Sequence, residues 1–337
     1  MARVLLIPGD GIGPEVIPAA ARVLGSLGLD LQFEEAPAGF ACFQACGEAL
    51  PSETLERARR ADAVLFGACA SPSGEVAGYS SPILDLRRKL NLYANLRPVK
   101  SLPGPVSRPG IDFLIVRENS EGLYSGRERR EGETAIAERV ITRGASSRIA
   151  RVACQQAMLR ASGRATPPSL TVVHKANVLR VSDGLFRQCV LEVAREYPGL
   201  LVRELLVDTA ALRILQAPQT FDVLVTTNLF GDILSDEASG LIGGLGVAPS
   251  ANLGEGTPLF EPVHGAGLDI AGKGIADPVG AMLSGAMLLE HLGESSSARR
   301  LRSAVEATLE AGICTPDLGG TAGTEEFTSA VCGSLVG

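Results

Sequence analysis

The sequence predicts an α/β fold that contains much parallel sheet. Short apolar runs of strand length alternate with longer segments whose apolar residues recur at helical spacing. Strands that alternate with helices in this way assemble into largely parallel sheets, with the helices packed on their faces. The chain of 337 residues is long enough for two domains. Because no linker or repeat marks a boundary between them, a discontinuous domain built from both ends of the chain is compatible with the sequence.

The predicted elements begin with a strand at residues 3–7, which ends in the glycine turn PGDGIGPE (8–15). Pro14 suits the first turn of a helix, which we expect to continue to residue 25. Further strands are predicted at 29–36, 61–68, 111–116, 170–175, 200–207 and 221–227, and further helices at 145–163, 182–197, 230–242, 278–292 and 296–311.

The composition favours a cytoplasmic protein that binds neither nucleic acid nor membrane. The net charge is −7, and only residues 127–130 form a basic cluster. The seven cysteines are odd in number and form no CxxC pair, so we expect reduced and mostly buried thiols. The first apolar run is too short for a signal peptide, and no window of the sequence approaches the length of a membrane span.

The glycine turn invites comparison with a dinucleotide-binding loop. It follows a strand and opens a helix, and Glu34 stands about 20 residues further on. The spacing, however, is GxGxG rather than GxGxxG, and Asp10 and Glu15 would oppose a pyrophosphate at the helix N-terminus. We therefore expect a tight turn that requires positive φ at Gly11 or Gly13.

Two aspartates, Asp232 and Asp236, lie four residues apart in the apolar segment TTNLFGDILSDEASGLIGG (226–244), so they share a helix face. A solvated face would explain them. On a partly buried face, however, the carboxylates would repel one another, which a divalent cation relieves. A third carboxylate, Asp208, follows the strand predicted at 200–207, and strand ends are where sites collect in open α/β sheets. Oxygen ligands alone favour Mg²⁺ or Mn²⁺.

Three arginines, Arg87, Arg97 and Arg117, lie near one another in the sequence. Each alone is most often a surface residue, but together with a metal site they predict capture of a small polycarboxylate. Lys175 ends an apolar strand, where desolvation would lower its pKa towards base chemistry, although taken alone a lysine that reaches solvent is the favoured explanation. Tyr124 stands near these polar motifs, and taken alone simple packing with a satisfied hydroxyl is favoured for it.

Taken together, these segments resemble the metal-dependent β-decarboxylating dehydrogenases, the family of isocitrate, 3-isopropylmalate, homoisocitrate and tartrate dehydrogenases. The resemblance runs from PGDGIGPE to TPDLGG, which is nearly the whole chain, and its motifs occur in the family's order. The motifs that carry it are YANLRP, VRENSEGLY, HKANVL, TTNLFGDILSD, GGLGVAPSAN, FEPVHG and DIAGKGIADP.

The resemblance implies an isocitrate/isopropylmalate dehydrogenase-like fold with two domains around a central cleft, not a Rossmann fold. Residues 1–98 plus 246–337 would form a large, discontinuous cofactor-binding domain. Residues 99–245 would form a small domain with the metal site and the dimer interface. A homodimer or tetramer with shared active sites is implied.

The resemblance also implies a role for each candidate residue. Lys175, acting through Asp208, would remove the C2 hydroxyl proton while hydride passes to NAD, and Tyr124 would protonate the enol after CO₂ leaves. The implied metal ligands are Asp208, from the second subunit, with Asp232 and Asp236. The implied substrate-binding residues are Ser71, Ser80, Ser81, Arg87, Arg97, Arg117, Tyr124, Lys175 and Asn177.

The implied cofactor is NAD. Members that use NAD place an aspartate against the adenosine ribose, and Asp269 occupies this position, where it would repel a 2′-phosphate. Two departures predict weaker binding: HGSAPD of the family is HGAGLD here, and the adenine-binding asparagine is Asp277, which accepts but does not donate. The implied cofactor-binding residues are Cys69, Ala70, Ser71, Asn177, His264, Gly265, Ala266, Gly267, Leu268, Asp269, Ile270 and Asp277.

Substrate choice is expected to depend on GYSSPILDLRRKL (78–90). This segment most resembles the homoisocitrate branch of the family, which implies oxidation of homoisocitrate to 2-oxoadipate in lysine biosynthesis, with Ser80 and Ser81 bonding the distal carboxylate. Ile83 and Leu84 are instead typical of isopropylmalate enzymes, so isopropylmalate and isocitrate stay open as substrates. A non-catalytic regulatory subunit is a further alternative, but such a chain should lack the acid, the base or the metal ligands, which are all present.

Overall fold

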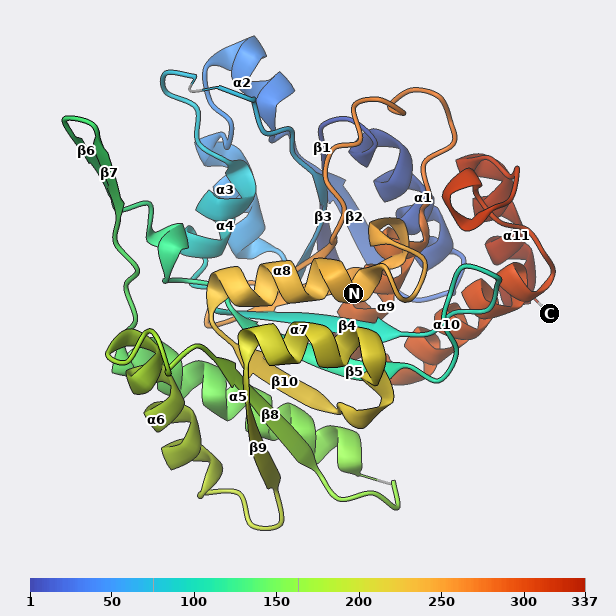
Figure 1. Cartoon of the computed structure of the whole chain (residues 1–337). Coiled ribbons are helices and arrows are strands. Elements are labelled where there is room, and N and C mark those ends of the chain that lie inside the picture. The colour runs from blue at the N-terminus through green and yellow to red at the C-terminus, as the bar shows by residue number, and fades with distance from the viewer. Residues whose placement is uncertain (75, 163, 337) are drawn as a thin grey trace. The chain divides into compact units, whose positions relative to one another are not determined.

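The computed structural model describes residues 1–74, 76–162 and 164–336. The chain forms two compact units, whose elements are labelled in Figure 1. Because both ends of the chain belong to unit 1, unit 2 is an insertion in its sequence. Unit 1 comprises Met1–Leu92, Ser101–Pro109 and Ser239–Gly337, and unit 2 comprises Tyr93–Lys100 and Gly110–Ala238.

The strands of unit 1 follow the order β2-β1-β3-β12-β11. The first four are parallel to one another, and β11 runs antiparallel to β12. Residues Val4 to Ile7 of β1 are all buried, as expected of a parallel strand whose two faces are both covered. The bounds are β1 Ala2–Gly9, β2 Leu31–Glu35, β3 Ala63–Ala68, β11 Pro249–Leu253 and β12 Leu259–Pro262.

Helix α9 lies at the centre of the helical packing in unit 1. It contacts β3, β11 and β12 as well as α1 and α10, and this enclosure explains why it is apolar almost all round. Within the described ranges, no helix has the length and apolar character needed to cross a membrane. The helices are α1 Gly13–Gly25, α2 Phe40–Cys46, α3 Ser52–Arg60, α4 Pro82–Lys89, α9 Val279–His291, α10 Ser295–Glu310 and α11 Thr324–Val336, with 3₁₀ turns η3 Leu245–Val247 and η4 Pro316–Leu318.

The strands of unit 2 follow the order β4-β5-β10-β8-β9, with β4 antiparallel to β5 and the others parallel. Helix α5 packs against β5, β8 and β10 and against α6 (Figure 1). A separate exposed hairpin joins β6 to β7. The strands are β4 Ala94–Lys100, β5 Asp112–Glu118, β6 Glu128–Glu131, β7 Thr134–Ala137, β8 Ser169–His174, β9 Leu201–Leu206 and β10 Val223–Thr226. The helices are α5 Arg143–Ala161, α6 Ser182–Ala194, α7 Val207–Gln216 and α8 Asn228–Ser239, with 3₁₀ turns η1 Leu123–Ser125 and η2 Pro218–Thr220.

The predicted α/β class is confirmed, but the sheet strands include two antiparallel pairs that the strand–helix alternation does not reveal. The prediction missed β4, because a proline within a short run argues against a strand. Pro98 nevertheless lies in the middle of β4, opposite Leu114 of β5. The expected domain boundary between residues 98 and 99 falls inside this strand, and the one between 245 and 246 falls after Ala238, the last residue of unit 2.

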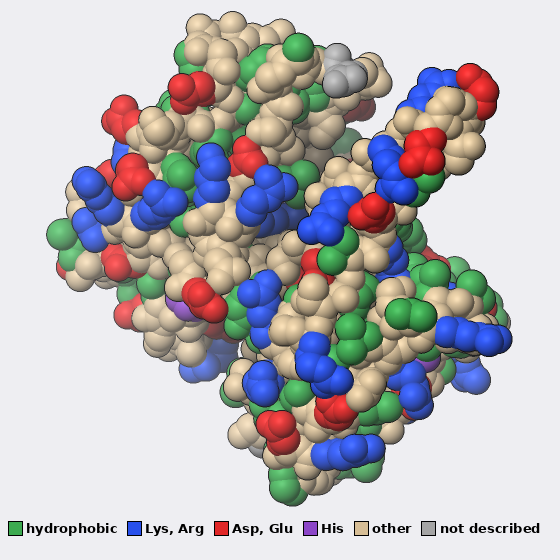
Figure 2. Space-filling model, turned by 90° about the vertical axis from the view of Figure 1, so that its left-hand side faces the viewer, with side chains coloured by type: hydrophobic (Ala, Val, Ile, Leu, Met, Phe, Trp, Pro, Cys, Tyr) green, Lys and Arg blue, Asp and Glu red, His purple; other side chains and the backbone are tan. Residues whose placement is uncertain are grey.

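The surface carries both signs of charge. On the face drawn in Figure 2, lysine and arginine side chains are interspersed with aspartate and glutamate rather than gathered into one field. All seven cysteines are free thiols. Three of them, Cys154, Cys189 and Cys314, are buried, where they act as small apolar side chains.

Candidate active site

The two aspartates of α8 lie one helical turn apart and share arginine partners. Asp232 accepts hydrogen bonds from the guanidinium of Arg117 and from the hydroxyl of Tyr124, and its Oδ1 lies 3.2 Å from Arg97 Nη1. The same Arg97 nitrogen lies 3.1 Å from Asp236 Oδ1. The aspartate side chains are 28% and 49% exposed, so a ligand can reach both carboxylates.

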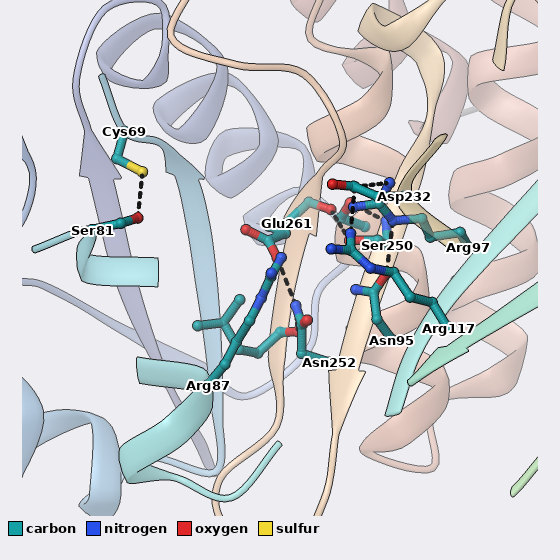
Figure 3. Close-up of polar contacts among 12 residues, drawn as sticks. Cys69, Ser81, Arg87, Asn95, Arg97, Arg117, Asp232, Ser250, Asn252 and Glu261 are labelled. Carbon is teal, nitrogen blue, oxygen red and sulfur yellow. Dashed lines mark hydrogen bonds and ion pairs between the residues drawn. The ribbon is translucent and has the colours of Figure 1, made fainter. Parts of the chain in front are cut away.

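Buried polar side chains hold the two arginines in place (Figure 3). Arg97 donates through Nε to Asn95 Oδ1 at 2.7 Å and through Nη1 to Ser235 Oγ at 2.6 Å. Arg117 donates from Nε and Nη2 to Asn228 Oδ1 at 3.1 and 2.8 Å. Its side chain is only 2% exposed, so its charge must be satisfied by these partners and by the aspartate.

Gly231 gives Arg117 its room beside α8. A Cβ at this position would lie 2.6 Å from Cγ of Arg117, closer than atoms approach without something moving. The glycine of the motif NLFGD therefore has a packing reason that the sequence alone does not show. Substitution by alanine would displace the arginine from the aspartate.

The titration of the site follows from burial and from the neighbouring charges. Burial raises the pKa of Tyr124, and the hydrogen bond to the Asp232 carboxylate raises it further, so the phenol keeps its proton at neutral pH. Burial also raises the pKa of Asp236; Asp232 adds to this effect and Arg97 opposes it. A carboxyl with a raised pKa beside a second carboxylate, as at Asp236, is one whose charged form a cation would stabilise.

The α8 carboxylates fit a hard divalent cation in part. Asp232 and Asp236 offer oxygen ligands on one helix face, which is the chemistry that Mg²⁺ and Mn²⁺ prefer. Among the residues that the structure describes, no group of three or more histidine, cysteine, aspartate or glutamate side chains is placed to hold a metal. One chain thus provides two of the three predicted ligands together, and a metal here needs further ligands from substrate, water or a second chain.

Asp208 is instead paired with Lys175. It stands in the first turn of α7 and its Oδ1 accepts a hydrogen bond from Lys175 Nζ at 2.5 Å. This bond lowers the pKa of the exposed Asp208 carboxyl. Lys175 is the first residue after β8, and Asn177 follows on an exposed turn. The predicted base, which is partly buried, and the predicted third metal ligand, which is exposed, therefore form one pair at the carboxyl end of β8.

The third predicted arginine belongs to unit 1 and has a different partner. Arg87, on α4, donates through Nη2 to Glu261 Oε1 at 2.7 Å, and the same oxygen accepts from Asn252 Nδ2 at 2.7 Å (Figure 3). Both members of the ion pair are about nine-tenths buried, and Arg87 Nε has no hydrogen-bond partner among the described residues. An unpaired buried donor is costly, so this nitrogen is a plausible contact for an anionic ligand.

The segment after β3 holds the serines of the predicted substrate site. Ser80 donates to Asp85 Oδ2 at 2.5 Å, so its proton is committed to a carboxylate. Ser81 Oγ lies 3.7 Å from Cys69 Sγ, and burial raises the pKa of that thiol. The backbone N–H of Ala70 donates to Asp10, and Ser71 is exposed. Asp85 therefore places a negative charge next to Ser80, one of the serines expected to bind the distal carboxylate of the substrate.

The glycine turn after β1 contacts the predicted cofactor-binding loop at Ala266. Gly11 has φ +61°, as expected, whereas Gly13 has no positive φ. A Cβ on Gly11 would lie 1.8 Å from the carbonyl oxygen of Ala266, and that oxygen accepts a hydrogen bond from Ile12 N at 2.8 Å. Glu15 accepts from Gly272 N at 2.6 Å. Glu15, one of the two acidic residues that argued against a pyrophosphate site, thus braces another loop.

That loop, residues 263–272, presents groups that fit a dinucleotide. His264 binds through Nδ1 to the Gly265 carbonyl at 2.9 Å, and its buried Nε2 has no partner among the described residues. Burial lowers the pKa of His264, so the ring is neutral. A turn closed by hydrogen bonds from Ile270 N and Ala271 N to the Gly267 carbonyl exposes its intervening residues, Leu268 and Asp269, to solvent.

The surroundings of Asp277 favour a protonation state that the sequence did not predict. Its Oδ1 accepts from Val279 N at 2.8 Å, while its buried Oδ2 has no partner among the described residues. Burial, together with the nearby Asp317, raises the pKa of Asp277 well above its ordinary value and favours the neutral carboxyl. A neutral carboxyl donates as well as accepts, whereas the sequence argument treated the side chain as an acceptor alone.

Sequence reasoning missed the side chains that orient the three arginines. A usable signal existed, because these polar residues interrupt otherwise apolar strands or helix faces, and buried polar groups need partners. Apart from Asn95, which lies two residues from Arg97, the partners could not be assigned, since they come from distant segments. The missed residues are Asn95, Asn228, Ser235, Asn252 and Glu261.

Known proteins resemble this chain over nearly its whole length. A family model described as isocitrate/isopropylmalate dehydrogenase matches residues 3–331. An isocitrate/homoisocitrate dehydrogenase of Thermus thermophilus is 53% identical over 333 residues, 99% of this chain and 98% of that protein. A 3-isopropylmalate dehydrogenase of Methanothermobacter thermautotrophicus is 49% identical over 334 residues, with 99% and 98% covered. A crystal structure of isocitrate dehydrogenase from Methylococcus capsulatus matches with a TM-score of 0.93 at 42% identity, covering 99% of both chains.

Proposed function

The chain belongs to the isocitrate/isopropylmalate dehydrogenase family, and from this premise we propose that it oxidatively decarboxylates homoisocitrate to 2-oxoadipate with NAD and Mg²⁺ or Mn²⁺. The family's enzymes are oxidative decarboxylases of small carboxylic acids. They use a nicotinamide cofactor and a divalent metal, and they are typically oligomeric. The particular substrate, cofactor and assembly of this chain are our proposal.

One observation carries the proposal. The carboxylate of Asp232, a proposed metal ligand, receives hydrogen bonds from the proposed acid, Tyr124, and from one proposed substrate-binding arginine, Arg117; a second, Arg97, pairs with it. Three side chains from residues 97–124 thus converge on a carboxylate that stands more than 100 residues further along the chain. A metal chelated by substrate at this point would bring the substrate against both the arginines and the tyrosine.

Two side chains would carry the proton transfers of the reaction, with Lys175 as the base and Tyr124 as the acid. Lys175, through Asp208, accepts the proton of the substrate's C2 hydroxyl as that carbon is oxidised. Arg87, Arg97 and Arg117 hold the malate carboxylates. After the β-carboxylate leaves as CO₂, Tyr124 returns a proton to the enol carbon, and its raised pKa keeps that proton available. The proton taken and the proton returned balance across the reaction.

The two absent groups supply the remaining chemistry. Asp232 and Asp236, with Asp208 of the partner subunit, would hold a divalent cation, which would supply Lewis-acid polarisation of the oxygen that becomes the ketone. The loop of residues 263–272 would hold a nicotinamide cofactor, which would supply the hydride acceptor, and the exposed Asp269 would favour NAD because its charge would repel the 2′-phosphate of NADP. The shared metal site makes a homodimer the smallest active assembly.

Asp269→Lys tests the cofactor assignment. We expect the ratio of kcat/KM for NAD to that for NADP to fall by about 100-fold or more, because one change removes a repulsion and adds an attraction of several kcal/mol in total. Asp30→Lys serves as the charge-matched control, because Asp30 is an exposed aspartate that immediately precedes β2. An unchanged ratio in Asp269→Lys would show that this carboxylate does not face the ribose.

A second substrate, 3-isopropylmalate, is favoured by a specific observation. Ile83 and Leu84 present apolar side chains on α4, and the hydroxyl of Ser80 is bonded to Asp85 rather than free for a distal carboxylate. The negative Asp85 would oppose the longer tricarboxylate, unless Ser81 and Arg88 compensate for it.

The deciding experiment compares kcat/KM for homoisocitrate, isocitrate and 3-isopropylmalate at saturating Mg²⁺ and NAD. A preference for homoisocitrate supports the proposed substrate, and a preference for isopropylmalate would assign α4 to an apolar pocket. The purified chain should form NADH alone. Stabilisation by Mg²⁺ without turnover of any of the three acids would favour the regulatory-subunit alternative.

A further inference from the structure

A buried ion pair beside Lys175 has no part in the proposed chemistry. Asp183, in the first turn of α6, is fully buried, and the guanidinium of Arg139 donates to its Oδ1. The arginine side chain is itself only 13% exposed. Burying an ion pair is seldom more stabilising than packing apolar side chains of the same size, so stability alone does not account for this pair.

One end of the pair holds the backbone of Lys175. The second carboxylate oxygen of Asp183, Oδ2, accepts the Lys175 N–H at 2.6 Å. The Lys175 carbonyl accepts from Leu179 N at 2.8 Å, and the Leu179 carbonyl accepts from Asp183 N at 3.0 Å. Hydrogen bonds within residues 175–183 therefore join the two ends of this segment, because the Asp183 side chain binds the backbone of Lys175, the residue that follows β8.

The other end of the pair reaches the start of α8. Arg139 Nη2 donates to Thr227 Oγ1 at 2.8 Å, and its guanidinium carbon lies 4.8 Å from the centre of the Phe230 ring. Thr227 is buried and immediately precedes α8, where its carbonyl accepts from Gly231 N at 2.9 Å. The guanidinium thus bridges the end of β8, which carries Lys175, and the N-terminus of the helix that carries the two aspartates.

We propose that Arg139 and Asp183 are positioning residues that hold the backbone of Lys175 in place. The inference rests on the proposed function, in which Lys175 is the base. Neither residue touches substrate in this account. A lysine side chain is long and flexible, so fixing its backbone reduces the positions from which Nζ can act. A carboxylate also accepts hydrogen bonds from the arginine and from the backbone at once, which an apolar pair could not do.

Asp183→Asn tests the proposal. It keeps the shape of the side chain, removes its charge and leaves one acceptor for two donors. We expect kcat to fall about 10- to 100-fold, because small misplacements of a reacting group cost this much. KM for the substrate should change by less than about threefold, since the substrate-binding arginines are not involved. If Asp183 were only structural, Asp183→Asn would lower the amount of folded enzyme and leave the kcat of the folded molecules unchanged.

A second readout does not depend on turnover. The rate at which acetic anhydride labels Lys175, followed by mass spectrometry of its peptide, reports the exposure and proton state of Nζ. We expect Asp183→Asn to change this rate, while the rates at Lys100 and Lys273 stay at their wild-type values. Arg139→Lys keeps the charge but loses the planar bridge to Thr227, and we expect a smaller change of the same kind. If Asp183→Asn does not fold, Arg139→Lys decides the question.

Asp222→Asn is the matched control. Asp222 immediately precedes β10, at the other end of the strand from Thr227, and it accepts from Arg160 Nε at 2.8 Å. This pair is also largely buried in unit 2. We expect a loss of stability with unchanged kcat and unchanged labelling of Lys175. An equal fall of kcat in Asp222→Asn would overturn the proposal, because any lost ion pair would then have the same effect.

Wild-type kcat and wild-type labelling in Asp183→Asn would also overturn it. A further variant distinguishes failure of the proposed function from failure of this proposal. Lys175→Met should abolish turnover, and if this variant kept wild-type turnover the base assignment would be wrong. The labelling results would still show whether the ion pair positions the lysine.

Discussion

Asp10, which follows β1, and Asp232, in the middle of α8, are aspartates that are held in opposite ways. Asp10, in unit 1, is 6% exposed and accepts from three backbone groups: Phe40 N at 2.7 Å, Ala41 N at 2.9 Å and Ala70 N at 2.8 Å. Asp232, in unit 2, is partly exposed and its donors include the side chains of Arg117 and Tyr124.

The difference lies in what the donors can do. A backbone N–H cannot rotate away from its acceptor without moving the chain, so Asp10 is committed to holding three segments together. Side chains can turn to other partners, so the bonds of Asp232 can be exchanged for a ligand. A carboxylate held by backbone is therefore part of the architecture, and one held by ionisable side chains is a candidate for chemistry.

The largest effect is expected from Asp232→Asn. A neutral amide is a poor ligand for a hard cation, so turnover should fall by at least about 100-fold, reflecting the several kcal/mol that a metal contributes. The stabilisation of the protein by Mg²⁺, measured as a shift in Tm, should be lost with it. Glu237→Gln, a change of the same kind on α8, is the control. Wild-type turnover and wild-type Mg²⁺ stabilisation in Asp232→Asn would remove this residue from the metal site.

Tyr124→Phe should lower kcat by about 100-fold, because it removes the proposed proton donor. KM should change little, since the ring and its packing over Arg117 remain. Steady-state kinetics on the best substrate provide the measurement, with Tyr93→Phe as the control for loss of a hydroxyl. A Tyr124→Phe enzyme with wild-type kcat would mean that another group protonates the enol.

Asp10→Asn should act on stability and not on the metal. The amide keeps one acceptor for three N–H donors, so at least one buried donor loses its partner, at a cost of about 1–3 kcal/mol in the free energy of unfolding. Denaturant unfolding measures the loss, and the affinity for Mg²⁺ should stay at its wild-type value. A loss of Mg²⁺ affinity without a loss of stability would reverse the roles that we assign to the two aspartates.

The smallest effect is expected from Asp277→Asn, and it should depend on pH. The pKa of Asp277 is raised in the folded state, so its contribution to stability is full below about pH 4, the ordinary pKa of aspartate, and is lost as the pH rises towards the folded value. Asparagine does not titrate. The variant should therefore gain stability relative to wild type as the pH rises above about 4.

Chemical denaturation at pH 5 and pH 8 measures this gain. Asp30→Asn, at an exposed site, controls for the removal of one negative charge. A difference between variant and wild type that stayed constant between the two pH values would show that Asp277 ionises normally in the folded protein.

Local pattern was sufficient for part of this molecule. The alternation of strands and helices specifies an α/β protein, and a spacing of four residues places Asp232 and Asp236 on one face of α8, because helix geometry is set by neighbours in the sequence. Family motifs extend this to Lys175 and Tyr124. β4 escaped the pattern, since Pro98 interrupts it and only its pairing with β5 makes it a strand.

The partners of these residues depend on which segments the fold brings together. Arg117 meets Asp232 across 115 residues and Arg87 meets Glu261 across 174, contacts that no local periodicity encodes. The neutral state of Asp277 likewise arises from burial beside Asp317. Helix faces and strand alternation follow from short-range backbone geometry, whereas ion pairs, raised pKa values and the bridge from Arg139 to Thr227 follow from desolvation and distance in the folded chain.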